Sequence, residues 1–212
     1  MAKTRIEWCD RTVNSVKGLC KYNCWYCYAR KLYKRWGWDT EVRFDINILI
    51  KEAKIKKPQK IFIGSTHDIF GYWIPDQWIK DIIYITKQNP QHIYLFLTKN
   101  PARYENFNFP KNCWLGQTIT GGYGDVYLPI KTNICFISYE PMFAPLEHSI
   151  MHYDWIVCGG LTGEKTKSPH KKEWIDKIVE NGKKYNVKIF IKDNAKYDKV
   201  IKEFPQQKTG GE

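Results

Sequence analysis

The sequence lacks any long apolar run, and its acidic residues are the minority among its charges. It contains 22 Asp and Glu residues against 34 Lys and Arg, a formal net charge of +12 at pH 7. No segment approaches the ~18 consecutive apolar residues of a membrane-spanning helix. The first residues, MAKTRIE, have no apolar core of the kind found in signal peptides. We therefore expect a cytoplasmic protein with no membrane partner.

Internal repeats, low-complexity segments and linkers are also missing. The 212 residues, of which 43% are hydrophobic, suffice for one domain with a proper core. We expect this domain to cover residues 1–204. Residues 205–212 end in Thr-Gly-Gly-Glu and are expected to form a flexible tail.

The excess of positive charge has two interpretations, and the sequence leaves both open. It favours an anionic partner, of which nucleic acid is the first candidate. Alternatively, the lysines only solvate the surface of a chain rich in Lys, Ile, Asn and Tyr, as an AT-rich genome would encode. The basic and aromatic run at 28–36 is predicted to be an exposed amphipathic helix, either a solvated face or a platform for phosphates.

Seven cysteines, an odd number, argue against a framework of disulfides and for a reducing compartment. Cys113, Cys135 and Cys158 lie in predicted strands, where cysteine behaves as a small hydrophobic residue. The remaining cysteines therefore carry whatever chemistry the thiols perform.

Cys20, Cys24 and Cys27 form a C-x₃-C-x₂-C run that can converge on one metal centre. Thiolates at such short spacings hold iron–sulfur clusters. A 4Fe–4S cluster held by three cysteines has one iron open to a cofactor or substrate. The alternative, a structural zinc site, usually has a second Cys or His pair, which is missing here. Cys9 or His67 would reach such a site only through folding.

The same three cysteines, with Trp25 directly after the second, are similar to the signature of radical S-adenosylmethionine (SAM) enzymes. A longer series of motifs between Ile6 and Asn194 resembles a phage-associated radical-SAM-like family of undefined substrate. These motifs are Ile6-Glu7-Trp8, Gly18-Leu19-Cys20, Cys27-Tyr28-Ala29, Thr98-Lys99-Asn100-Pro101, Trp114-Leu115-Gly116, Ser138-Tyr139-Glu140-Pro141 and Trp155-Ile156-Val157-Cys158-Gly159-Gly160.

Short apolar runs alternate with helical patterns, which predicts an α/β fold with mostly parallel strands. The runs are 61–63, 93–97, 113–116, 134–137, 155–158 and 187–191, with a further strand expected near 6–8. Helices are predicted at 45–55, with Asp45 as N-cap, and at 75–87, 101–106, 170–185 and 196–204. The resemblance implies that these elements form a partial (β/α) barrel of the radical SAM type.

Ligands of parallel α/β folds bind at the C-terminal ends of the strands. Polar or small residues follow the predicted strands at these ends. They are Ser65, Asp68, Lys99, Gln117, Thr118, Ser138, Glu140 and Gly159. Because strand-end Ser, Thr and Asp often only cap helices, their convergence at one edge matters more than any single residue.

The resemblance implies a 4Fe–4S cluster on the three cysteines and SAM on its open iron. Trp25 and Tyr26 are then expected to wall the adenine. Ser65 and Asp68 replace the Gly-Gly-Glu motif that binds the methionine amino group in many radical SAM enzymes. The remaining expected contacts are Gln117 and Thr118 to the ribose, Ser138 and Glu140 to the carboxylate, ribose or substrate, Gly159 to the cofactor, and Lys99 to the SAM carboxylate.

Lys99 and Glu140 are the candidate catalytic residues, although Glu140 could instead form a structural ion pair with Lys99 or Arg103. The expected reaction is reductive cleavage of SAM to a 5′-deoxyadenosyl radical that abstracts hydrogen from a substrate. An electron donor such as flavodoxin or ferredoxin is implied, and a nucleic acid or modified nucleotide is the first candidate substrate, with a partner protein as a further possibility. The alternatives are a peptide or small metabolite as substrate, and a non-catalytic, zinc-stabilised nucleic-acid-binding protein.

Overall fold

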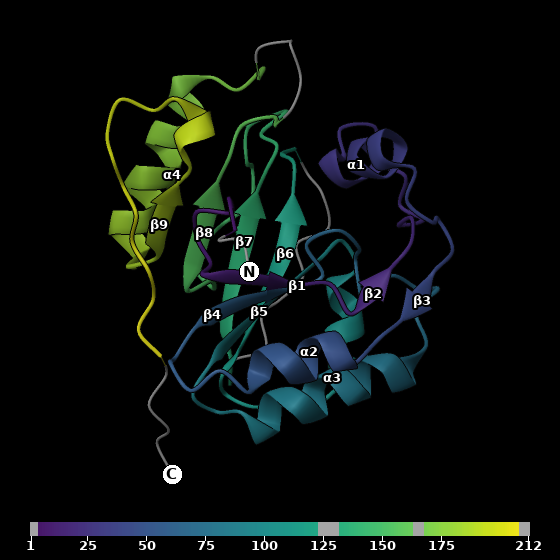
Figure 1. Cartoon of the computed structure of the whole chain (residues 1–212). Coiled ribbons are helices and arrows are strands. Elements are labelled where there is room, and N and C mark those ends of the chain that lie inside the picture. The colour runs from purple at the N-terminus through teal and green to yellow at the C-terminus, as the bar shows by residue number, and fades with distance from the viewer. Residues whose placement is uncertain (1–3, 123–131, 163–167, 208–212) are drawn as a thin grey trace. The chain divides into compact units, whose positions relative to one another are not determined.

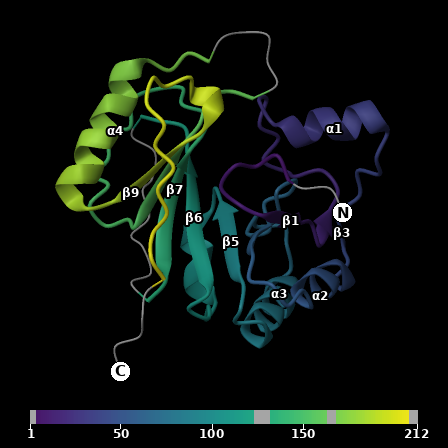
Figure 2. The ribbon, with the colours of Figure 1, turned by 60° about the vertical axis from the view of Figure 1, so that its left-hand side comes forward.

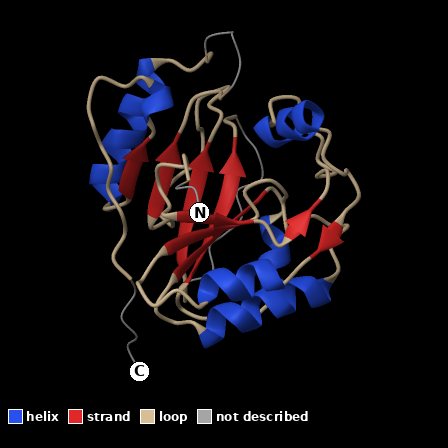
Figure 3. Cartoon of the chain, in the orientation of Figure 1, coloured by secondary structure: helices blue, strands red, loops and turns tan. Residues whose placement is uncertain are grey.

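The computed structural model describes residues 4–122, 132–162 and 168–207, and the contacts group into two compact units, Met1–Trp114 and Leu115–Glu212. Each unit combines helices with parallel strands (Figures 1 and 3). The predicted α/β class with mostly parallel strands is therefore confirmed. A single domain over residues 1–204 stays a prediction. None of the helices described is long and apolar enough to cross a membrane.

The first unit contains three parallel strands in the order β1-β4-β5. The start of β6 follows β5, where the Tyr94 N–H donates to the Asn112 carbonyl at 2.8 Å. A separate antiparallel pair joins β2 to β3. The strands are β1 (Arg11–Val13), β2 (Val16–Lys17), β3 (Arg43–Phe44), β4 (Lys60–Ile63), β5 (Ile93–Thr98) and β6 (Cys113–Ile119), which contains the boundary between the units.

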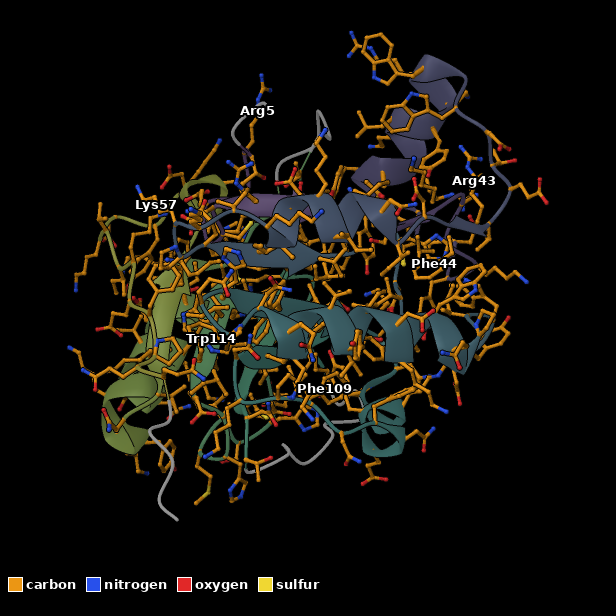
Figure 4. The ribbon with its side chains drawn as sticks, turned by 60° about the horizontal axis from the view of Figure 1, so that its bottom comes forward. Arg5, Arg43, Phe44, Lys57, Phe109 and Trp114 are labelled. Atoms are coloured by element: carbon orange, nitrogen blue, oxygen red, sulfur yellow. The ribbon has the colours of Figure 1, made fainter. Side chains whose placement is uncertain are left out.

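The helices of the first unit are α1 (Tyr28–Trp36), α2 (Asn47–Ala53), α3 (Asp76–Gln88) and the 3₁₀ helix η1 (Pro101–Asn106). Helices α2 and α3 lie side by side (Figures 1 and 4), and Ile79, Ile82 and Ile83 are the buried face of α3. Helix α1 is the predicted basic helix, with only Ala29 and Tyr33 buried. The buried residues of α1 therefore form only a narrow apolar stripe along the helix.

The core of the first unit is aromatic. Trp8 packs on Phe62 with ring centroids 4.7 Å apart, and Phe70 contacts Phe96 and Phe109 (labelled in Figure 4) at 5.8 and 6.0 Å. Pairing of Ile63 with Phe96 sets the register of β4 and β5, so both strands end at the same edge. This register brings the segments after β4 and β5 together.

The second unit continues from β6 through β7 (Ile134–Tyr139), β8 (Trp155–Cys158) and β9 (Lys188–Ile191), in that order. Every residue of β7 and β8 is buried, as expected for strands covered on both faces. Helix α4 (Lys172–Tyr185) lies along β9 (Figure 2), and the short 3₁₀ helix η2 (Asp193–Ala195) follows β9.

Two predicted elements are wrong. Residues 6–8 form a turn instead of a strand, and the first strand is β1, so Trp8 serves as a buried core residue. Residues 196–204 are not a helix. The chain runs extended along β9, where the Ile191 N–H donates to the Ile201 carbonyl at 2.8 Å. Pairing with an open strand edge, together with the Trp155–Phe204 ring contact at 5.2 Å, outweighs local helix propensity here.

Smaller differences concern helix ends. Helix α2 begins at Asn47, and its N-cap residue is Ile46 instead of the predicted Asp45. The Asn47 N–H donates to the Asp45 carboxylate at 3.1 Å, so Asp45 still binds the start of the helix from one residue further back. Pro75 precedes α3 as its N-cap instead of being its first residue. Helix α4 begins at Lys172, because the His170 ring contacts Ser168 and Ala195. Residues 205–207 have no helix or strand, and 208–212 of the predicted tail lie outside the described residues.

Gly116 predicts a measurable packing constraint in the second unit. A Cβ atom at this position would lie 2.3 Å from Cζ of the buried Phe136 ring. Gly116→Ala should therefore lower the free energy of unfolding by about 1–3 kcal/mol through overpacking, measured by urea denaturation. Gly116→Ala should cost less unfolding free energy in a Phe136→Leu background than in the wild type, because the smaller side chain relieves the contact. Additive losses in this cycle would contradict the contact.

Candidate functional site

Cys20, Cys24 and Cys27 lie on one tight loop between β2 and α1. The Asn23 N–H donates to the Cys20 carbonyl at 3.4 Å, and the Cys27 N–H donates to the Cys24 carbonyl at 3.1 Å. Asn23 takes the left-handed conformation (φ 51°), which asparagine tolerates better than most residues. All three carry free thiols of intermediate exposure, and Cys27 directly precedes α1. Two turns thus present three thiols within eight residues.

Hydrogen bonds attach this loop to the strand ends of the first unit. The Tyr28 hydroxyl donates to the Ser65 carbonyl at 2.5 Å, and the Ser65 hydroxyl contacts the Asn14 amide at 3.1 Å. Arg30 donates to the Cys20 carbonyl at 3.3 Å. Asn14 directly follows β1 and Ser65 follows β4, so the cysteine loop lies at the C-terminal edge of these strands.

His67 fixes a second attachment point. The Trp73 indole N–H donates to Nε2 of His67 at 2.9 Å, so the ring proton is on Nδ1, which donates to the Gly18 carbonyl at 3.0 Å. Burial lowers the pKa of His67, and the bond to Gly18 opposes this shift. With both nitrogens occupied, His67 is polar lining and does not act as a metal ligand.

Asp68 joins the ends of β4 and β5. Its carboxylate accepts from the Thr98 hydroxyl at 2.8 Å, from the Lys99 N–H at 2.8 Å and from the Phe70 N–H at 3.0 Å. Burial raises the pKa of Asp68, and the bonds from Lys99, Thr98 and Phe70 oppose the rise. The carboxylate expected to bind the methionine amino group therefore already serves three donors of its own chain.

Lys99 reaches from the end of β5 to the cysteine loop. Its Nζ donates to the Tyr26 hydroxyl at 2.8 Å and lies 5.5 Å from the centre of that ring. Burial lowers the pKa of Lys99, and the negative charges of Cys24, Asp68, Cys20 and Cys27 oppose the shift. The side chain of Lys99 is thus the cation shared by all three thiols.

The three thiols have the type and number of ligands that a 4Fe–4S cluster with one open iron uses. Burial raises the pKa of Cys20, and the nearby Cys24 raises it further, although two backbone hydrogen bonds lower it. In the described residues, no three His, Cys, Asp or Glu side chains are already arranged around a metal position. The donor set fits a cluster in its chemistry, and the charges of the three thiols act on the nearby Lys99 ammonium.

Cys9 is too far from this loop to act as a fourth ligand. It precedes Asp10, whose N–H donates to the carbonyl of Lys60 at the start of β4, the edge opposite the cysteine loop. Cys9 is buried, and burial raises the pKa of its thiol to about 12. Its sulfur lies 3.8 Å from the Ile6 carbonyl, and hydrogen bonds with the Thr4 side chain and the Phe62 backbone partly oppose the rise in its pKa.

The expected aromatic wall divides into two different environments. Tyr26 is partly buried, and its hydroxyl accepts from Lys99. Burial raises the pKa of Tyr26, and the nearby Cys24 raises it further. The Trp25 side chain is 68% exposed and meets Tyr26 edge-on with ring centroids 5.6 Å apart. Trp25 therefore presents exposed indole surface beside the cysteines.

The candidates of the second unit form their own contacts at the ends of β6, β7 and β8. Glu140 forms an ion pair with Lys192, so the alternative pairing with Lys99 or Arg103 is wrong. Arg103 instead binds the carbonyls of Gly71 and Ile74 and the carboxylate of Asp76.

Gly159 adjoins this ion pair, and the other candidates lie on β6 and β7. A Cβ atom on Gly159 would lie 2.6 Å from Cδ of Glu140, so the glycine leaves room for the carboxylate. Gln117 is buried and accepts from the Tyr153 hydroxyl at 3.2 Å. Ser138 is buried within β7, and Thr118 is partly exposed within β6.

Asn14 and Lys192 contribute more than the sequence indicated. Asn14 binds Ser65 and Thr66 and belongs to the strand-end group, but the first strand was expected at 6–8, so its end was misplaced. A polar residue directly after the Arg-Thr-Val run of β1 was the available signal. Lys192 directly follows the predicted strand at 187–191, but nothing in the sequence indicated its role as the partner of Glu140.

Comparison with protein families gives a match over residues 3–212 to the family described as "Protein of unknown function (DUF5131)". No curated protein and no solved structure matches the chain. The match covers both units and includes every residue considered above.

The environment of His67 predicts a dependence of stability on pH. The folded-state pKa is below the unfolded value of about 6.5, so the unfolded chain binds the proton more tightly and stability is lost as pH falls below that value. The loss should reach up to about 1.4 kcal/mol per pH unit, measured by urea denaturation between pH 7.5 and 5.5. His67→Gln keeps one donor and one acceptor and should flatten the profile. An unchanged profile in this variant would show that another group is responsible.

Proposed function

Since the chain belongs to this family of unknown function, we propose from its own residues that it is a radical SAM enzyme built as a partial (β/α) barrel. The supporting observation is the placement of Lys99. Its ammonium group donates to the hydroxyl of Tyr26, which lies between Cys24 and Cys27 in the sequence, and the charges of all three thiols oppose the lowering of the Lys99 pKa by burial. A structural zinc site has no need of a lysine beside its thiolates, whereas a redox centre with an anionic ligand gains from one.

In this proposal Cys20, Cys24 and Cys27 hold a 4Fe–4S cluster, and SAM binds beside them. When bound, the cluster supplies the electron that cleaves SAM to methionine and a 5′-deoxyadenosyl radical, which abstracts a hydrogen atom from the substrate. The electron comes from a donor protein such as flavodoxin or ferredoxin.

The protein's own task is to bind, orient and exclude water. Lys99 has the charge to pair with the SAM carboxylate, and its bond to Tyr26 fixes the position of its ammonium group. Asp68 acts indirectly, through Lys99, because its carboxylate accepts hydrogen bonds from the Lys99 backbone and the Thr98 hydroxyl. Asp68 is thus a positioning residue in place of the expected contact to the methionine amino group.

Other strand-end residues retain the roles that the resemblance implies. Ser65 and Tyr26 lie beside the cysteine loop. In the second unit, Gln117 and Thr118 carry ribose-binding chemistry, and the carboxylate of Glu140, next to Gly159 and Ser138, is proposed to contact SAM or substrate. Its pairing with Lys192 orients that carboxylate.

Anaerobic reconstitution tests the proposal. The wild-type protein should contain iron and sulfide in equal amounts and should form 5′-deoxyadenosine from SAM under a strong reductant. Cys24→Ala should abolish this product, because one of the three ligands is lost. Cys113→Ala, which removes a buried thiol of β6, should retain it. Product from the Cys24 variant would show the ligand assignment to be wrong, and zinc without sulfide would refute the proposal.

Lys99 provides a second test. Lys99→Met keeps the length of the side chain but removes its charge and the bond to Tyr26. Losing one charge-assisted hydrogen bond of about 1.5–3 kcal/mol should weaken SAM binding about 10- to 100-fold, measured by equilibrium dialysis on the reconstituted protein. Iron content should stay unchanged, and Lys99→Arg should restore part of the affinity. SAM affinity within twofold of wild type in Lys99→Met would contradict this role.

A further inference from the structure

A groove of about 540 Å³ lies between the cysteine loop and α1, entirely within the first unit. We call it the α1 groove, and the lining residues that matter here are Cys24, Trp25, Arg30, Lys31, Lys34 and Trp38. Its volume lies within the range of ligand sites in proteins. It is therefore large enough for a ligand and directly adjoins the thiols.

The charged residues that line the α1 groove are all basic. Three of its lining residues are cations, and none is Asp or Glu. Helix α1 itself contains Arg30, Lys31, Lys34 and Arg35 and no acidic residue. A lining of this kind attracts an anion, and several cations spaced along one helix suit several phosphates.

Two indoles are presented to the same groove. Trp25 is 68% and Trp38 is 46% exposed, although tryptophan usually buries its ring. Neither side chain is loose. Trp25 meets Tyr26 edge-on, and Trp38 meets the buried Tyr33 edge-on at 5.3 Å and 86°. These contacts restrain the indoles and so reduce the entropy lost on binding, while their exposed fractions give indole surface that a base can reach.

We propose that the α1 groove binds single-stranded nucleic acid, with unpaired bases stacked on Trp25 and Trp38 and phosphates on Arg30, Lys31 and Lys34. Stacking on exposed rings combined with a basic track is the mode by which proteins bind single strands without reading sequence. A duplex keeps its base faces covered, so it gains only the phosphate contacts. This inference rests on the proposed function, because a polynucleotide bound in the α1 groove would be the substrate of the reaction proposed at the neighbouring thiols.

The test is fluorescence anisotropy with labelled oligonucleotides of about 12 nucleotides, as single-stranded DNA, single-stranded RNA and duplex DNA, on the full chain before and after reconstitution. Single strands should bind tighter than duplex, and the DNA and RNA arms identify the natural form. Three phosphate contacts predict an affinity loss of about 15- to 20-fold between 50 and 200 mM salt. Trp38→Ala should weaken binding about 5- to 150-fold, the range for one stacked base.

Matched variants separate the groove from general effects. Trp36→Ala removes an indole of α1 that is 60% exposed but does not line the groove, and it should leave affinity within twofold. Lys34→Gln should reduce the slope of log affinity against log salt by about 0.7, whereas Lys80→Gln on the exposed side of α3 should leave it unchanged. Equal losses from both tryptophan variants would overturn the proposed groove.

The binding test and the 5′-deoxyadenosine test fail independently. Oligonucleotide binding does not require the cluster, so Cys20→Ala, which removes a proposed cluster ligand that does not line the groove, should bind single strands while forming no 5′-deoxyadenosine. A protein that forms 5′-deoxyadenosine but binds no oligonucleotide at low salt would keep the proposed reaction and overturn the α1 groove as a nucleic-acid site. Binding of an acidic protein such as flavodoxin at the groove, with no binding of oligonucleotide, would overturn it as well.

Discussion

The carboxylate of Asp68 is the constraint on which the candidate site depends. It binds the hydroxyl of Thr98 and two backbone N–H groups, and so connects the segment after β4 to the end of β5. This connection fixes the backbone of Lys99, whose side chain then reaches Tyr26 between the second and third cysteines. A buried carboxylate is costly unless donors surround it, and the three donors here offset that cost. The position of the cation at the thiols is thus decided by an acid on a different strand end.

The site balances burial against charge. Burial disfavours both the ammonium of Lys99 and the thiolate of Cys20, whereas the charges of the cysteines and of Asp68 favour the Lys99 ammonium and two backbone hydrogen bonds favour the Cys20 thiolate. His67 contributes without charge, since its neutral ring uses one nitrogen as donor and the other as acceptor to join Gly18 to Trp73. Neutral hydrogen bonds of His67 therefore hold the segment before the cysteine loop, and the Lys99 ammonium holds Tyr26 within that loop. This arrangement leaves Trp25 and the basic face of α1 to the solvent, where the proposed single-stranded ligand would bind.

Local pattern and tertiary pairing disagreed in two places, and both are instructive. The Ile-Glu-Trp segment at 6–8 alternates as a strand would, yet it turns so that Trp8 can pack on Phe62, and the strand forms at Arg11–Val13 instead. The segment at 196–204 contains helix formers, but the exposed edge of β9 offers backbone partners that a helix could not use. In both cases a contact distant in sequence outweighs a preference of less than about 1 kcal/mol per residue.

The sequence by itself determined the α/β class, the six main strand runs, the basic helix at 28–36 and the cysteine trio, because hydrophobic periodicity and short spacings are local properties. It also indicated the strand ends as the place of polar residues. Only the tertiary structure decided which of those residues meet: Asp68 with Thr98 and Lys99, Lys99 with Tyr26, and Glu140 with Lys192. Such pairings depend on strand register and loop path, which are set by packing between segments far apart in the chain.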